Sequence, residues 1–267
     1  MSPAPSPAVS PDLAVDAAPP AQSPPEQSPP VQSRRERLRD ELRREVLDAA
    51  RHQLAGQHGL SKLTMAAIAK EVGVTPPALY RHFENRQDII AQLCVLIVEE
   101  VRCELSAAVG RQRPGDVAAA LVASTRASLD WAVRNPAEFD LVIGSGIRAE
   151  IPDSDVLQRR MAEMVGGHYV PLFRELAASG IPRQADDEID PELTEQICRY
   201  RDAVGGQDLP LGIAHLMVTS WRQVYGLQCM AVYGHQEFAF GDHVALHEDM
   251  VSALLVQMGL EPRPAVR

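Results

Sequence analysis

Residues 64–88 carry side chains suited to holding a phosphate backbone on a short helix that follows a tight turn. Tyr80, Arg81 and His82 place a hydroxyl, a guanidinium and an imidazole on the outer side or edge of that helix. Two short helices around a tight turn form the geometry that places a helix in the major groove of DNA. The segment therefore predicts binding to double-stranded DNA.

The first of these two helices has clear start and stop signals. Thr64 is a suitable N-cap, and apolar residues follow it at helical spacing: Met65, Ile68, Ala69 and Val72. Gly73 ends the helix because glycine enters the left-handed conformation without steric cost. With an upstream apolar stripe over residues 38–54, the pattern predicts a three-helix unit over about 36–84.

The second helix is predicted to begin at a second N-cap, Thr75. Pro76 and Pro77 occupy its first turn, where a missing N–H costs little. Leu79 and Phe83 are four residues apart and therefore face inward together.

The run LTMAAIAKEVGVTPPALYRHFENRQDII resembles the signature of the TetR family of one-component transcription regulators, over roughly residues 38–97. The rest of the chain resembles the family only in being a helical region of suitable size. The resemblance implies an all-α fold, in which an N-terminal three-helix helix-turn-helix DNA-binding domain precedes a C-terminal helical ligand-binding and dimerisation domain.

The resemblance also implies roles for individual residues. Thr64, Tyr80 and His82 stand where the family holds phosphates, and Arg86 stands at a basic position that does the same. Residues Thr75 to Ala78 correspond to the tip of the recognition helix.

The sequence departs from the family at this tip. Many members have a lysine or arginine and then a glycine where this chain has Pro76 and Pro77. Because proline has neither charge nor donor, direct base reading by the tip should be poor. DNA shape or other side chains would have to contribute more, namely Lys62, Thr75, Tyr80 and Arg81.

Charge is unevenly distributed along the chain. The chain has a formal charge of −10, from 26 Lys and Arg against 36 Asp and Glu. Residues 34–86 carry +4, whereas the residues after them carry −11, which favours orientation of the basic end toward DNA. Arg34 and Arg35 open an arginine cluster that could follow a phosphate backbone, or could be a solvated first helical turn interleaved with acids.

Residues 1–33 contain 10 of the 21 prolines, which predicts a disordered tail. We divide the chain into this tail, a DNA-binding domain at 34–85 and an effector-binding and dimerisation domain at 86–267. The sequence shows no secretory signal pattern and no apolar run long enough to cross a bilayer. We therefore expect a cytoplasmic protein without membrane contact.

Helical patterns continue after residue 86. They predict helices at about 86–105, 117–134, 137–144, 153–179, 191–205, 210–233 and 242–258. The last two helices carry so few charges that more than one face of each should be buried by packing. We therefore expect a homodimer in which both helices pack against their copies in a second chain. The alternative is that the two helices only complete a monomer core.

Aromatic and polar residues of the C-terminal region predict a pocket for a small organic effector. They are Trp131, Phe139, His168, Tyr169, His215, Met217, Trp221, Tyr225 and Gln228. Each alone is more often a core group than a ligand contact. Arg222 could meet an anionic effector, or equally form a salt bridge at the dimer interface.

Catalytic and metal patterns are weak. A G-x-G-x-x-A run at 144–149 has no predicted strand before it. His243 and His247 could be half of a metal site, but they lack its further ligands, so we expect a surface or interface pair. We therefore predict no catalytic site, metal or cofactor. The sequence favours a dimeric repressor released from operator DNA by an effector. The alternatives are an enzyme with a vestigial helix-turn-helix unit, or a regulator controlled by a protein partner.

Overall fold

The computed structural model describes residues 34–56, 60, 63–144, 146–151, 154–180, 189–235 and 237–262. The predicted tail at 1–33 and Lys62 lie outside these residues. Residues 1–39 and 40–267 form two separate units. Every element in the described ranges is a helix, which confirms the all-α fold class.

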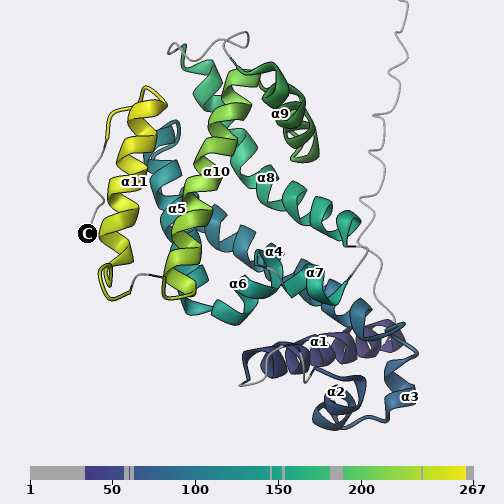
Figure 1. Ribbon diagram of the computed structural model, residues 1–267. Coiled ribbons are helices and arrows are strands. Elements are labelled where there is room, and N and C mark those ends of the chain that lie inside the picture. Colours follow the sequence, from purple (N-terminus) through teal and green to yellow (C-terminus); the bar gives the residue numbers. More distant parts are fainter. Residues whose placement is uncertain are drawn as a thin grey trace, which may run out of the picture. The chain divides into compact units, whose positions relative to one another are not determined.

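Eleven helices are described, and Figure 1 labels each of them. In chain order they are α1 (Arg34–Ala55), α2 (Met65–Val72), α3 (Pro76–Leu79), α4 (Arg86–Gly110), α5 (Val117–Arg134), α6 (Pro136–Val142), α7 (Gly146–Glu150), α8 (Asp155–Ala178), α9 (Pro191–Ala203), α10 (Leu211–Val232) and α11 (His243–Gln257). The sequence predicted all of these except α7. None of the described helices is long and apolar enough to cross a bilayer.

The predicted caps around α2 and α4 are present. The Thr64 hydroxyl accepts a hydrogen bond from the Ala67 N–H at 3.1 Å, and the Asn85 side chain accepts one from the Asp88 N–H at 2.9 Å. Gly73 ends α2 with a φ of 77°, a conformation that side chains with a Cβ disfavour. These caps fix the ends of the helices that flank α3.

Helix α3 is only four residues long. Thr75 precedes it in an extended conformation but makes no side-chain cap bond. The two prolines remove the first two N–H groups of the helix, and the Ala78 N–H bonds to the Thr75 carbonyl at 2.8 Å. The Thr75 hydroxyl is consequently not used as a cap.

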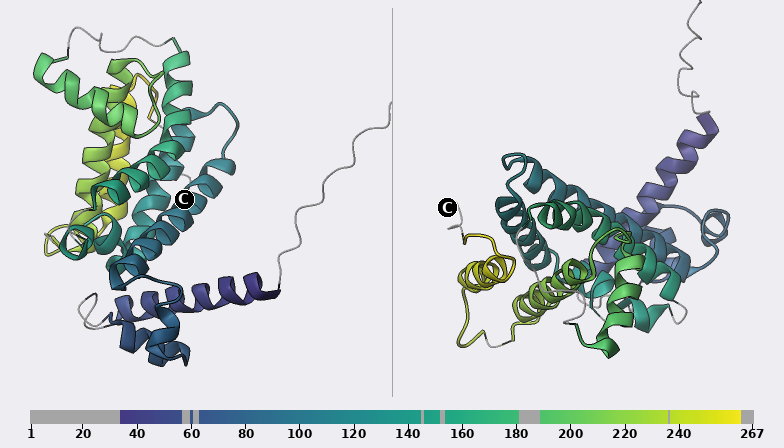
Figure 2. Two further views of the ribbon diagram at one scale, coloured as in Figure 1. Left: turned by 90° about the vertical axis from the view of Figure 1, so that its right-hand side faces the viewer. Right: turned by 90° about the horizontal axis from the view of Figure 1, so that it is seen from above.

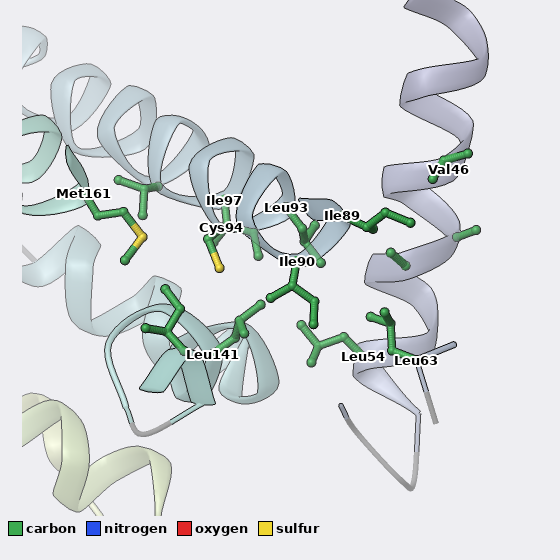
Figure 3. Packing of buried hydrophobic residues seen from close by; sticks show 14 of the residues in the cluster. Val46, Leu54, Leu63, Ile89, Ile90, Leu93, Cys94, Ile97, Leu141 and Met161 are labelled. Atoms are coloured by element: carbon green, nitrogen blue, oxygen red, sulfur yellow. The ribbon is translucent and has the colours of Figure 1, made fainter. Parts of the chain in front are cut away.

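One hydrophobic cluster runs along α4 (Figure 3). At the start of α4, Ile89 lies toward the α1 segment that carries Val46, and Ile90 lies toward Leu54. Further along the helix, Cys94 and Ile97 lie toward residues of α6 and α8, including Leu141 and Met161. The boundary that we proposed at 85/86 therefore lies inside a continuous core.

The C-terminal helices form a second cluster around α10. Helix α10 packs against α5, α8, α9 and α11, and α4 packs against α5 and α8 (Figures 1 and 2). Where α8 passes the end of α9, a Cβ on Gly166 would lie 2.4 Å from the Val204 Cβ. Glycine at 166 therefore permits the close contact between these segments.

Candidate nucleic-acid interface and internal cavity

The segment around α3 separates an inward apolar side from an outward polar side. Leu79 and Phe83 are 0% and 1% exposed, as the helical spacing predicted. Tyr80 is 55% exposed, and Arg81 is also exposed. The Arg43 guanidinium lies over the Phe83 ring at 5.5 Å from its centroid, which covers the buried side. The buried pair therefore anchors a segment that presents Tyr80 and Arg81 to solvent.

The threonines that precede α2 and α3 present hydroxyl groups to solvent. Thr64 and Thr75 are exposed, and the Thr64 oxygen uses only its acceptor capacity in the cap bond. Pro76 and Pro77 are exposed, whereas Ala78 is half-buried. The tip of α3 therefore presents two proline rings flanked by hydroxyl donors, without a charged side chain.

Three further predicted positions can be placed. His82 is half-buried, and its Nδ1 atom is buried without a hydrogen-bond partner. Arg34 and Arg35 are exposed in the first turn of α1. The described side chains thus leave the histidine Nδ1 and both arginines uncommitted at the predicted positions.

Arg86 differs from the expected phosphate contact. Its guanidinium donates to the Leu63 carbonyl at 2.5 Å and to the Leu60 carbonyl at 2.6 Å, and it forms an ion pair with Glu150 of α7. Its side chain is 23% exposed. The rigid fork of arginine suits three acceptors at once, so Arg86 acts as a clamp between the loop before α2 and the end of α7.

A second polar link joins α1 to α4 and α6. Arg51 of α1 forms ion pairs with Glu138 of α6 at 2.6 Å and with Glu100 of α4 at 2.7 Å. The hydrogen bond to Glu138 is the main cause that raises the pKa of Arg51. Neither link could be predicted from local sequence signals, because the acidic partners lie 49 and 87 residues along the chain from Arg51 and 64 residues from Arg86.

A partly open cavity of about 290 Å³ lies among the helices of the C-terminal region, and the exposed Trp221 is part of its wall. Helices α4, α5, α8, α10 and α11 contribute most of its wall, and α9 contributes Tyr200. The volume is near the lower end of the range found for small-molecule sites, roughly 300–1,000 Å³. The arrangement can therefore enclose a small organic molecule.

Three of the nine predicted pocket residues line this cavity: Tyr169, Met217 and Trp221. Gln228 lies behind the wall, where its amide donates to Ser128 at 2.6 Å. The remaining five are Trp131, Phe139, His168, His215 and Tyr225, and they do not line it. Periodicity could not separate the cavity-facing positions from their neighbours, because wall and core are equally apolar on these helices.

The excluded residues have structural contacts instead. Trp131 and Phe139 are 2% and 0% exposed in the cluster along α4. Tyr225 stacks on Trp221, with ring centroids 5.5 Å apart. These rings support the wall of the cavity without forming its surface.

The half-buried His168 and the buried His247 hold polar contacts to neighbouring hydroxyl groups. The His168 Nε2 lies 2.8 Å from the Ser124 hydroxyl. The His247 Nε2 lies 3.0 Å from the hydroxyl of Thr125, a wall residue that itself donates to the Leu121 carbonyl. Because that proton is engaged, His247 must be the donor to Thr125.

Burial lowers the pKa of both histidines to about 4. Nearby charge adds to the effect of burial: Arg102 lowers the pKa of His168 further, and Arg126 does the same for His247, opposed by Asp130. Both rings are therefore neutral at pH 7.

His243 and His247 differ in burial, since His243 is half-buried and His247 is buried. His247 is 2% exposed and bonded to Thr125, so it is a core residue and not the surface or interface group that we expected. Among the described residues, no group of three or more metal-ligating side chains comes together.

Comparison with known proteins identifies the family. Residues 46–93 match the model of the bacterial regulatory proteins of the tetR family. The HTH-type transcriptional regulator Rv1816 of Mycobacterium tuberculosis is 26% identical over 202 residues, which span 73% of this chain and 82% of that protein.

Solved structures show the same fold. The crystal structure of the regulatory protein SCO4313 is 24% identical, covers 84% of this chain and all of its own, and has a TM-score of 0.62. A TetR family transcription regulator from Marinobacter aquaeolei VT8 is 17% identical, covers 82% of this chain and 97% of its own, and has a TM-score of 0.52. With the helix-turn-helix geometry described above, these matches lead to one conclusion: the chain carries the N-terminal helix-turn-helix domain of the TetR family of bacterial transcriptional regulators, followed by a helical C-terminal region.

Proposed function

We propose that this regulator represses transcription by binding operator DNA as a homodimer, and that a small organic effector releases it. The single observation that carries DNA binding is the outward presentation of Tyr80 and Arg81 on a segment anchored by Leu79 and Phe83. Exposed hydroxyl and guanidinium groups are donors from which phosphate oxygens accept hydrogen bonds.

The proposed contacts fall into two groups. Tyr80, Arg81 and the Thr64 hydroxyl hold phosphates, with His82 and the exposed arginines at 34 and 35 as further donors. Thr75 is left as the polar side chain at the tip of α3, because Pro76 and Pro77 cannot donate. We therefore expect specificity to depend strongly on DNA shape, with few direct base contacts.

The homodimer is proposed to form through α10 and α11. On α10, Gln223 and Gly226 are exposed, and a Cβ at Gly226 would meet no atom within 4 Å. On α11, Ala253 and Val256 are exposed, the valine by 60%. Small and apolar residues on adjacent exposed helix faces allow close packing against a second copy. A two-fold dimer would hold two recognition helices about 34–36 Å apart.

The dimer has a direct test. Light scattering after size-exclusion chromatography should give the mass of two chains, and Gly226→Arg should give the mass of one because it places a bulky charge in the interface. Arg199→Ala, on an exposed part of α9, should remain dimeric as the matched control. A monomeric wild-type chain at micromolar concentration would contradict the proposal.

Effector release is proposed to work by a shift between two conformations. The cavity wall includes Val98, Val101 and Leu105 of α4, the helix whose first residue is the Arg86 clamp. A ligand that favours a displaced α4 would change the placement of the DNA-binding segment. Operator and effector would then weaken each other's binding, typically by about 1–3 kcal/mol.

Selection of duplexes from a random-sequence library tests the proposed function as a whole. We expect a palindromic site that wild-type protein shifts at low salt and that Tyr80→Phe binds less tightly at every sequence. Recovery of no enriched duplex would contradict operator binding. Turnover of a cavity ligand without any DNA binding would favour an enzyme with a vestigial helix-turn-helix unit. Release of DNA only by a protein would favour control by a protein partner.

A further inference from the structure

The cavity wall contains no acidic or basic side chain. Among the described residues that line it, none is Lys, Arg, Asp, Glu or His. Arg222, a candidate anchor for an anion, is exposed outside the cavity and donates to Thr219 at 3.1 Å. His168 and His247 do not line the cavity, and both are neutral at pH 7. The wall therefore offers an ion no opposite charge.

The tyrosines of the wall do not supply a charge either. Burial raises the pKa of Tyr169, and it raises the pKa of Tyr200 to about 12. Both phenols are therefore uncharged near neutral pH. An ion that entered would lose its water without gaining a partner, which is strongly unfavourable.

Most polar groups of the wall already have partners. Thr125 donates to the Leu121 carbonyl, and Ser220 donates to the Leu216 carbonyl. Gln158 is bonded through both ends of its amide, to Ser154 and to Arg148. These groups have little capacity left for a ligand that needs several hydrogen bonds.

Ser128 is different from these groups. Its oxygen accepts from the Gln228 amide at 2.6 Å, so its own proton remains to be donated. Gln228 is 1% exposed, and its Oε1 atom is buried without a partner. If the Gln228 amide were flipped, its Nε2 atom instead of its Oε1 atom would lack a hydrogen-bond partner. Ser128 lines the cavity, so the pair has spare hydrogen-bonding capacity at that wall.

We propose that the effector is an uncharged, mainly apolar molecule that carries one hydroxyl or carbonyl group bound by Ser128. The cavity of about 290 Å³ has room for such a molecule, since one water needs only roughly 10–15 Å³ of volume measured in this way. This inference depends on the proposed effector-binding role of the cavity and specifies its ligand.

Three probes with the same chain test the ligand class: 1-decanol, decanoate and decylammonium. The binding signal is the change in Trp221 fluorescence, because Trp221 lines the cavity whereas Trp131 is buried elsewhere. We expect 1-decanol to bind and to raise the melting temperature. Decanoate should bind at least about 100-fold more weakly at pH 7, because it must first take up a proton to enter.

The pH dependence of decanoate binding shows whether its charge or its shape makes it bind weakly. Between pH 8 and pH 6, the apparent affinity for decanoate should rise about tenfold for each pH unit that is lowered, while the affinity for 1-decanol stays constant. Equal affinity for 1-decanol and decanoate at pH 7 would overturn the proposal, as would binding of none of the three probes.

Ser128→Ala tests the anchor, and Ser220→Ala is the matched control in the same wall. We expect Ser128→Ala to weaken 1-decanol binding about fivefold, and Ser220→Ala to leave it unchanged because that proton is held by Leu216. Equal effects of the two variants would overturn the role of Ser128. Binding of 1-decanol that leaves the DNA complex intact would instead contradict the proposed release mechanism, while the ligand class would stand.

Discussion

Replacement of Arg86 distinguishes a structural clamp from a phosphate contact. Its guanidinium bonds to two carbonyls and to Glu150, and the two charged side chains are 23% and 22% exposed. A hydrogen bond from a charged donor contributes about 1.5–3 kcal/mol when buried. Partial exposure reduces these contributions, so we expect Arg86→Ala to lower the free energy of unfolding by about 3 kcal/mol.

This loss should be visible as a lower melting temperature. For a chain of this size each kcal/mol corresponds to about 2–4 °C, so Arg86→Ala should melt about 6–12 °C below wild type in calorimetry. Arg86→Lys keeps the positive charge but cannot bond to three acceptors at once, so it should retain only about a third of the stabilisation. A phosphate contact would behave differently, because lysine holds a phosphate as a point charge.

DNA binding measured well below the melting temperature completes the comparison. We expect Arg86→Ala and wild type to show the same dependence of affinity on salt, since the clamp holds protein groups and no phosphate. An unchanged melting temperature for Arg86→Ala, combined with a shallower salt dependence, would refute the clamp and restore the phosphate role.

Three further predictions concern DNA contact, pH and packing. Tyr80→Phe should weaken binding to all duplexes about two- to tenfold without changing the melting temperature, and affinity equal to wild type in fluorescence anisotropy would remove the tyrosine hydroxyl from the interface. The pKa of His247 is about 4 in the folded chain and 6.5 in the unfolded chain, so the folded chain holds this ring neutral. The free energy of unfolding is therefore at its full value above pH 6.5, and up to about 3 kcal/mol of it is lost as the pH falls toward 4. His247→Gln should reduce this loss in denaturant titrations at pH 7 and pH 5, and an identical loss in wild type and variant would contradict the role of His247. Gly166→Ala should cost about 1–3 kcal/mol because its Cβ would meet Val204, whereas Gly167→Ala, with open space around its Cβ, should be neutral or stabilising; equal melting temperatures would contradict the tight packing.

Local signals in the sequence were sufficient for most of the helices. Thr64, Gly73 and Asn85 act within one helical turn of themselves, so their caps could be predicted from the chain alone. Leu79 and Phe83 followed from spacing in the same way. Helix α7 was missed because it has only five residues and no periodic apolar stripe.

Long-range contacts could not be predicted in this way. Arg86 and Glu150 are 64 residues apart, and a basic residue at a helix start looks the same whether it meets a phosphate or a protein carbonyl. The cavity presented the same difficulty. Trp131 and Trp221 are both aromatic residues on helices, yet only Trp221 lines the cavity, because the packing of α5 against α10 decides which face is covered.

Binding of DNA phosphates by the exposed side chains around α3 is the basis of the proposed function. Its most direct test is the salt dependence of affinity for a selected duplex, measured by fluorescence anisotropy for Arg81→Ala and for Arg199→Ala, which removes the same charge from an exposed site on α9. Because each lost phosphate contact lowers the slope of log affinity against log salt by about 0.9, a dimer of Arg81→Ala should lose about 1.8 while Arg199→Ala keeps the wild-type slope. Identical slopes for wild type and both variants would contradict the account.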